Sequence, residues 1–363
     1  MQSSSLQKAT QVLLFFSLVI TVLYLARPFL VPFCFAALLA MLFLPLSVKL
    51  ETLGLNRPLA ILACIVILLA VIAVIAGLLT WQISDLVKDL GNVEERAMKI
   101  FRDIKTFIAE KFGVSEANQQ KAITDQTAEG GRLIAGISAG TLGLLVDFIL
   151  VLVYVFLFIF YKERIRKFIL KVVPHQKADS AEDAIGKIQK VSQQYLAGTA
   201  IMIACLWVMY SIGFSIIGLK NPVFFALLCG SLELVPFVGN LTGNFFAGIM
   251  ALVQDGGMSL VLSVVIVYAV IQFLQTYLLE PLVVGTGVNL NPLFTIIALV
   301  AGELVWGIPG LVLAIPLMGI VKIVCDHIPA LEPYGYLMGR EKKSGFGDAM
   351  RKWLHKFTGR KSK

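Results

Sequence analysis

Apolar residues along the chain fall into long runs separated by shorter polar stretches. The first run, residues 12–46, is apolar apart from Arg27. As one helix rising about 1.5 Å per residue, it would be roughly 52 Å long, well beyond the ~30 Å hydrocarbon core of a bilayer. Arg27-Pro28 and Pro32 divide the run, because proline interrupts helical hydrogen bonding. The pattern therefore predicts two membrane spans, at about 10–27 and 29–48.

Further apolar runs of spanning length lie at 58–81, 142–161, 195–219 and 259–279. Two further apolar segments, at 221–253 and 291–325, are divided into short halves by proline and glycine. The predicted fold class is therefore an all-α polytopic membrane protein. It has six or more transmembrane helices plus two broken or re-entrant helical hairpins.

The two interrupted segments are copies of one motif. Both begin Asn-Pro-x-Phe, at Asn221 and Asn291, and both place Glu-Leu-Val twelve residues later, at Glu233 and Glu303. The offset is 70 residues throughout, with no gap. Each apolar half-segment of about 14 residues reaches roughly 21 Å as a helix, too short to span. Short, interrupted, repeat-related segments are typical of a transporter's binding region, although Asn-Pro alone also starts many ordinary helices.

Three polar segments separate or follow the spans: 82–141, 162–191 and 328–363. In the first, apolar residues recur at three- and four-residue steps from Ile83 to Phe107, which predicts an extramembrane helix with one apolar face. The other two segments are basic. Residues 350–357 of the tail could form an amphipathic turn or two on a membrane surface.

The distribution of basic residues predicts the topology. If the basic segments face the cytoplasm, both termini and residues 162–190 are inside and 82–141 is outside. The chain must then cross the membrane an even number of times between 195 and 325. Two full spans and two hairpins that enter and return satisfy this condition. Because one full span separates the hairpins, they enter from opposite sides. This is an inverted-topology repeat. The second arm of the second copy is long enough to span fully, which would leave the parity unchanged.

Composition agrees with a bilayer as solvent, since hydrophobic residues make up 58% of the chain and charged residues 15%. The net charge of +8 is distributed as cytoplasmic flanks of membrane helices, so no nucleic-acid partner is expected. The five cysteines lie in or beside apolar segments without a CxxC pair. Neither a disulfide framework nor a zinc site is expected, and no cofactor is predicted.

Glu233 and Glu303 are the first candidates for functional chemistry. A charged group at membrane depth costs at least ~2.5 kcal/mol, so it is a functional hypothesis by default. Such carboxyl groups could take up and release protons. The alternative is that each carboxylate lies at the water interface or binds a nearby backbone amide.

The remaining candidates are polar residues beside the first break, on one face of the 259–279 span and at the end of that span, where Glu280 could instead be only a boundary residue. Broken helices free backbone groups that water, side chains or a ligand must satisfy. The side chains could contact a polyol, line a cavity, or only cap the backbone and bond between helices. With Glu233 and Glu303, they complete the predicted substrate or ion pathway: Asn240, Thr242, Asn244, Gln272, Gln275 and Glu280.

An enzymatic function is not expected. Residues 136–140 match the G-x-S-x-G pattern of hydrolases, but that motif needs a preceding strand, a histidine and an acid. All three histidines belong to the predicted cytoplasmic face, whereas Ser138 is outside. The sequence contains no Walker A loop, HExxH or metal-spacing cluster.

Motifs of the carboxyl half resemble those of the autoinducer-2 exporter family of bacterial permeases. In this chain they read PFVGN at 236–240, LEPLVVG at 279–285, LNPL at 290–293, GIPG at 307–310 and LAIP at 313–316. The resemblance implies export of small molecules, including a hydroxylated signalling furanone, and for some members sodium/proton exchange. A homo-oligomer, with a pentamer as one candidate, is implied by resemblance only.

We therefore expect a secondary transporter of the bacterial inner membrane, exporting a small organic solute by alternating access, with protons or sodium as candidate coupling ions. The alternatives are a sodium/proton antiporter, an oligomeric passive channel and a membrane scaffold. The expected domains are a scaffold (1–81), an extracytoplasmic insertion (82–141), a fourth span (142–161), a cytoplasmic basic segment (162–191), a transport core (192–327) and a basic tail (328–363).

Overall fold

The computed structural model describes residues 2–88, 143, 145–236, 238–254, 257–284 and 289–340. Within these residues the elements are helices, and the only extended pairing is an isolated bridge between Leu290 and Gly339. Six described helices are long and apolar enough to cross a membrane. A seventh candidate is the helix Leu145–Phe160, which is followed after a 68° bend by α6 (Lys162–Val172). The predicted all-α polytopic fold is confirmed.

The first apolar run forms two helices, as predicted: α1 (Gln2–Leu25) and α2 (Arg27–Thr52). The break falls at Ala26, and Pro28 takes an early position of α2, where its missing N–H leaves no hydrogen bond unmade. Pro32 was expected to help the division, but it lies inside α2. The following helix α3 (Arg57–Lys88) continues past residue 81 into the predicted insertion. The rest of that insertion, including residues 136–140, lies outside the described residues.

The amino-terminal scaffold packs around the helix Leu145–Phe160. Ala36 and Ala40 of α2 and Ile61 of α3 are buried with Val155 and Ile159. Arg57 donates a hydrogen bond to the Ile159 carbonyl at 3.0 Å. These contacts hold three predicted spans together.

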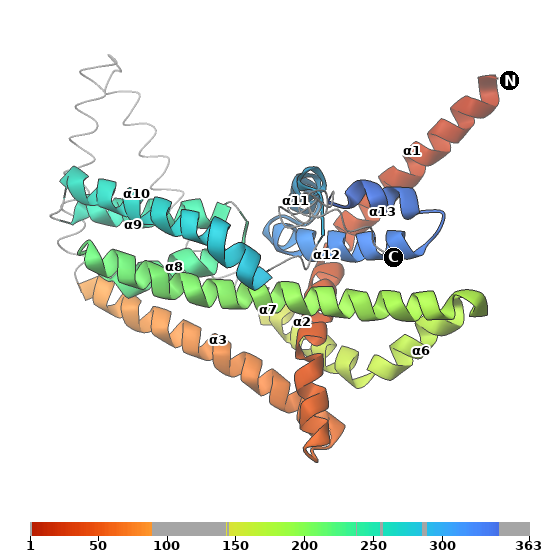
Figure 1. Cartoon of the computed structure of the whole chain (residues 1–363), viewed down its shortest axis with the longest axis horizontal. Helices are drawn as coiled ribbons and strands as arrows, with labels where there is room; N and C mark the ends of the chain where they lie inside the picture. The colour runs from red at the N-terminus through yellow and green to blue at the C-terminus, as the bar shows by residue number, and fades with distance from the viewer. Residues whose placement is uncertain are drawn as a thin grey trace, which may run out of the picture.

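The longest helix, α7 (Ala178–Ile216), follows the single turn η1 (His175–Lys177). Its 39 residues correspond to about 58 Å of helix, so α7 is longer than the bilayer core is thick. It passes through the expected boundary at 191/192 without a break. The basic segment and the first span of the transport core are therefore one rigid element, which extends along most of the molecule (Figure 1).

Four elements pack with the carboxyl-terminal part of α7. They are α8 (Pro222–Leu232), α9 (Val238–Val253), α10 (Gly257–Leu274) and the π-helical segment η2 (Gln275–Val284). Their shared core includes Leu206, Tyr210 and Phe214 of α7, Phe225 of α8 and Ala247 of α9. The hairpin α8–α9 lies beside the carboxyl-terminal half of α7 (Figure 1).

The second hairpin is α11 (Pro292–Trp306) and α12 (Ile308–His327), followed by the short helix α13 (Glu332–Met338). Asn291 caps α11, since its side chain accepts a hydrogen bond from the Leu293 amide at 3.0 Å. α12 is itself of spanning length. Both predicted broken hairpins are therefore present as helix–break–helix pairs. The tail from residue 341 lies outside the described residues.

Candidate functional site

The first hairpin turns in a tight break. α8 ends at Leu232, and Glu233 begins the connection with its amide donating to the Cys229 carbonyl at 3.3 Å. On the returning arm, a Cβ at Gly239 would lie 1.6 Å from the Leu232 carbonyl oxygen. Only glycine fits there, because a backbone carbonyl cannot move aside like a flexible side chain. This close approach brings the start of α9, which carries Asn240, against the end of α8, which Glu233 follows.

A network of polar side chains connects the returning arm to α7 and α10. The Tyr210 hydroxyl donates to Asn240 Oδ1 at 3.0 Å and accepts from Asn244 Nδ2 at 3.1 Å. Asn240 Nδ2 donates to Gln272 Oε1. Asn244 Nδ2 also lies 2.9 Å from both the carbonyl oxygen and Oδ1 of Asn240. Tyr210 and Asn240 are buried, at 1% and 6% exposure.

A second polar contact joins the break itself to η2. Gln275 Nε2 donates to Glu233 Oε1 at 2.7 Å. Gln275 is buried and is the first residue of η2. π-Helices are rare and are often found at functional sites. Glu233 and Gln275, with Tyr210, Asn240, Asn244 and Gln272, are called the polar cluster below.

Two acceptors in the polar cluster have no hydrogen-bond partner within the described structure: Asn244 Oδ1 and Gln275 Oε1, both buried. An unmade hydrogen bond of this kind costs about 1–3 kcal/mol. The cluster therefore offers two oxygen acceptors, beside the Glu233 carboxylate, that a donor on a ligand, a water or a cation would satisfy.

Five of the eight residues predicted from the sequence come together in the cluster: Glu233, Asn240, Asn244, Gln272 and Gln275. Thr242 is half-buried on the same arm, α9. Glu280 is exposed on η2, and its carboxylate interacts electrostatically with Glu233 and with Arg340. Glu303 is exposed on α11 and makes no side-chain hydrogen bond or ion pair with the described residues.

Sequence reasoning missed Tyr210, which makes contacts with both asparagines. A signal was present, because a buried tyrosine in an apolar span needs a partner for its hydroxyl. Tyr210 also lies at four-residue steps from the buried Leu206 and Phe214. The identity of the partner depends on how α7 is rotated against α9, which the pattern does not give.

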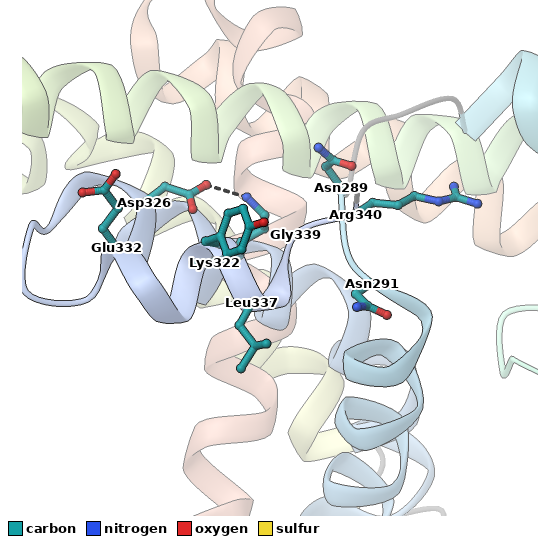
Figure 2. Close-up of a pocket in the computed structure, with 10 residues that line it drawn as sticks. Asn289, Asn291, Lys322, Asp326, Glu332, Leu337, Gly339 and Arg340 are labelled. Carbon is teal, nitrogen blue, oxygen red and sulfur yellow. Dashed lines mark hydrogen bonds and ion pairs between the residues drawn. The ribbon is translucent and has the colours of Figure 1, made fainter. Parts of the chain in front are cut away.

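A separate cavity of about 730 Å³ lies beside the second hairpin (Figure 2). Polar and charged side chains from the segment before α11, the end of α12 and α13 line it. Lys322 and Asp326, one turn apart on α12, form an ion pair at 2.5 Å on its wall. Of its residues, only Asn291 belongs to a motif that the sequence singled out. Because charged side chains of both signs line it, this cavity is polar and does not have the character of an apolar ligand pocket.

No group of three or more metal-binding side chains occurs in the part of the chain that the structure describes. The five cysteines are free thiols. Both observations fit a site built from amide, hydroxyl and carboxylate groups.

The chain is similar to several bacterial membrane proteins. It is 24% identical to "Putative transport protein YrrI" of Bacillus subtilis over 305 residues, covering 82% of this chain and 86% of that protein. It is also 24% identical to "Putative permease PerM" of Escherichia coli K12, covering 83% and 87% of the two chains. A "Putative transport protein" of Borreliella burgdorferi is 29% identical over 194 residues, about half of each chain.

The sequence profile of the AI-2E family transporters matches residues 13–330, which include the candidate spans of the described residues apart from the start of α1, both hairpins and the polar cluster. Together with the spanning helices, this match supports a multi-pass membrane transporter or permease. The chain belongs to the AI-2E transporter family.

Proposed function

We propose that this transporter moves a small, hydroxyl-rich organic solute by alternating access, that the polar cluster binds the solute, and that export from the cytoplasm is the physiological direction. The observation that carries the proposal is the convergence of six polar side chains from α7, the α8–α9 break, α9, α10 and η2. The α8–α9 break and the π-helical η2 depart from a regular α-helix at the cluster. Irregular backbone at membrane depth is tolerated where it lines a cavity or a binding site.

The chemistry of the cluster suits a polyol better than a charged or apolar ligand. Its amide groups both donate and accept, and its free oxygens, Asn244 Oδ1 and Gln275 Oε1, are acceptors. Hydroxyl groups can donate to these oxygens and accept from the amide NH2 groups. A hydroxylated furanone of the autoinducer-2 type has this pattern of groups, and the family resemblance points to the same substrate class.

Glu233 and Gln275 form the proposed coupling element. An ionised carboxylate only accepts hydrogen bonds. Gln275 therefore turns its NH2 group toward Glu233, with Nε2 at 2.7 Å from Glu233 Oε1. This orientation leaves Gln275 Oε1 as a free acceptor. Protonation of Glu233 would give it an O–H donor, to which the flipped amide could present Oε1. A sodium ion could instead take oxygen ligands from the same two side chains. Binding of either ion would change the hydrogen-bond donors and acceptors that the cluster presents to a solute.

The two hairpins are the proposed gates. Both termini and residues 162–190 are assigned to the cytoplasm, the membrane is the bacterial inner membrane, and the hairpins enter from opposite sides. Residues 1–81 and 145–160 serve as scaffold or as the contact of a homo-oligomer. The positive-inside distribution of basic residues supports this arrangement.

The test is solute flux in proteoliposomes with imposed proton or sodium gradients. The proposal expects accumulation of the furanone against its own gradient when one ion gradient is present, and none when both gradients are collapsed. Downhill flux that ignores both gradients would favour a passive channel. Ion exchange without solute movement would favour a sodium/proton antiporter. Absence of both kinds of flux would favour a scaffold.

A further inference from the structure

An apolar groove of about 530 Å³ lies on the scaffold, where the helix Leu145–Phe160 meets α6. Phe33 of α2, together with Tyr154, Leu157 and Phe158, forms its wall. The rings of Phe33 and Phe158 pack edge to face at 4.9 Å between centroids. The groove is therefore a fixed aromatic surface rather than a gap between loose side chains.

Arg164 and Phe168 of α6 close one end of this groove. α6 leaves the axis of the preceding helix at 68°, and no residue of α6 is buried. Phe168 and Val172 are 65% and 67% exposed. A helix bent away from a span, with bulky apolar side chains left uncovered, has the geometry of a helix that lies in the membrane interface.

The charges of α6 are strongly biased. The helix carries five basic residues and one acidic residue. Lys162 pairs with Glu51, and Arg166 pairs with Glu182 of α7. The other three, Arg164, Lys167 and Lys171, are exposed and have no acidic partner in the described structure. Their spacing of three and four residues puts them on one face, next to the face of Phe168 and Val172.

We propose that this place is a binding site for an anionic phospholipid. Its acyl chain lies in the groove against Phe33, Leu157 and Phe158, and its phosphate lies on Arg164 and Lys167. Charge selects the occupant: unpaired basic side chains at the end of an apolar groove favour a lipid with net negative charge over a zwitterionic one, whose cationic headgroup they repel. The proposal does not depend on the transported solute.

A second copy of the chain is the competing occupant of the same apolar surface. It is disfavoured, because α6 of a neighbour would bring a second set of basic residues toward the first. The two occupants differ in a measurable property, since a bound lipid adds only the small mass of one lipid molecule to the particle, whereas a second copy adds the mass of a whole chain.

The test is lipid binding to the purified full chain in detergent, measured by native mass spectrometry with phosphatidylglycerol and, separately, phosphatidylcholine. The proposal expects tighter binding of phosphatidylglycerol. The double variant Arg164→Gln/Lys167→Gln should weaken phosphatidylglycerol binding by about 30-fold, since each basic residue near an anionic headgroup contributes roughly 1 kcal/mol. The matched control is Lys177→Gln/Lys190→Gln, which removes the same charge from exposed positions outside α6 and should change binding little.

A second pair of variants tests the groove. Leu157→Trp adds bulk inside it and should lower binding of both lipids, whereas Val153→Trp places the same indole one turn away, at an exposed position outside the groove, and should change binding little. Equal affinities for the two lipids, or equal losses in the charge variant and its control, would overturn the proposal. A change of oligomeric mass in the α6 variant, with lipid binding unchanged, would assign the surface to a second copy of the chain and also overturn it.

Discussion

The hairpin α8–α9 encloses buried polar side chains, whereas the hairpin α11–α12 is closed by glycines and apolar contacts. In the first, Asn240 and Asn244 face Tyr210 and Gln272. With the 70-residue offset, their equivalents in the second are Gly310 and Ala314. A Cβ at Gly310 would lie 1.9 Å from the Gly302 carbonyl oxygen, so the two arms touch there.

The connections between the two arms also differ between the hairpins. The first connection leaves the helix for several residues after Leu232, while the second consists of Gly307 alone, with φ of 65° and ψ of −143°. Glu233 is hydrogen-bonded to Gln275, whereas its counterpart Glu303 is exposed. The second hairpin is instead fixed to α1, because Trp306 donates to the Leu23 carbonyl at 3.0 Å. One sequence motif has thus produced a hairpin that carries a buried polar cluster and a hairpin that is closed by glycine and apolar contacts.

The largest expected difference between the hairpins concerns their glutamates. Glu233→Gln keeps the size of the side chain but removes its charge and its titration. We expect it to abolish gradient-driven solute accumulation in proteoliposomes, whereas Glu303→Gln should leave accumulation close to that of the native protein. Equal losses in both variants would show that the glutamates act as a symmetric pair and would break the comparison.

Next in size is the effect of adding a methyl group at each break. Gly239→Ala places Cβ against a backbone carbonyl, so the first hairpin must open. Gly307→Ala meets nothing within 4 Å but is strained by its positive φ, which costs about 1–3 kcal/mol. Thermal unfolding in detergent should show the larger loss for Gly239→Ala. The opposite order would mean that the first break is more pliable than its contacts indicate.

Removing one hydroxyl from each hairpin region should give a smaller difference. Tyr210→Phe leaves Asn240 Oδ1 without its tyrosine donor and should cost roughly 1–3 kcal/mol of stability, with weaker solute binding. Thr295→Val removes only a hydrogen bond to the Asn291 carbonyl, and solute binding should be unchanged. Comparable losses of solute affinity in the two variants would place part of the site in the second hairpin.

The smallest effect concerns the first residue of each copy, and here the signs differ. Asn221 has a left-handed backbone, with φ and ψ both 51°, and makes no side-chain cap. Asn221→Gly should therefore stabilise the protein by about 1 kcal/mol. Asn291→Gly loses a capping hydrogen bond and should destabilise by a few tenths of a kcal/mol. Shifts of the same sign in thermal unfolding would contradict this difference.

The sequence was sufficient for the class of fold, the division of the first apolar run and the presence of two hairpins. These features follow from run length and from proline and glycine, which act locally. The π-helical turn at Gln275 and the continuity of α7 through residue 191 were not predicted. Both depend on packing between helices, since nothing within either segment marks them.

For the candidate site, the sequence indicated polar residues at the correct membrane segments but not which ones meet. Glu233 and Glu303 look equivalent in sequence because they share a register. Their surroundings differ because Gln275 comes from η2, outside the repeat, and has no counterpart beside α11. Tyr210 was missed because its partners, Asn240 and Asn244, lie 30 and 34 residues away, and only the packing of α7 against α9 brings them together.

The most direct test of the unequal hairpins is water access to the equivalent positions 244 and 314. Asn244→Cys and Ala314→Cys would each be made in a cysteine-free chain, reconstituted, and treated with a membrane-impermeant thiol reagent. The account predicts that the cysteine at position 244 is labelled, that the transported solute protects it, and that the cysteine at position 314 stays unlabelled. Labelling and solute protection at position 314, with none at position 244, would contradict the assignment of the site to the first hairpin.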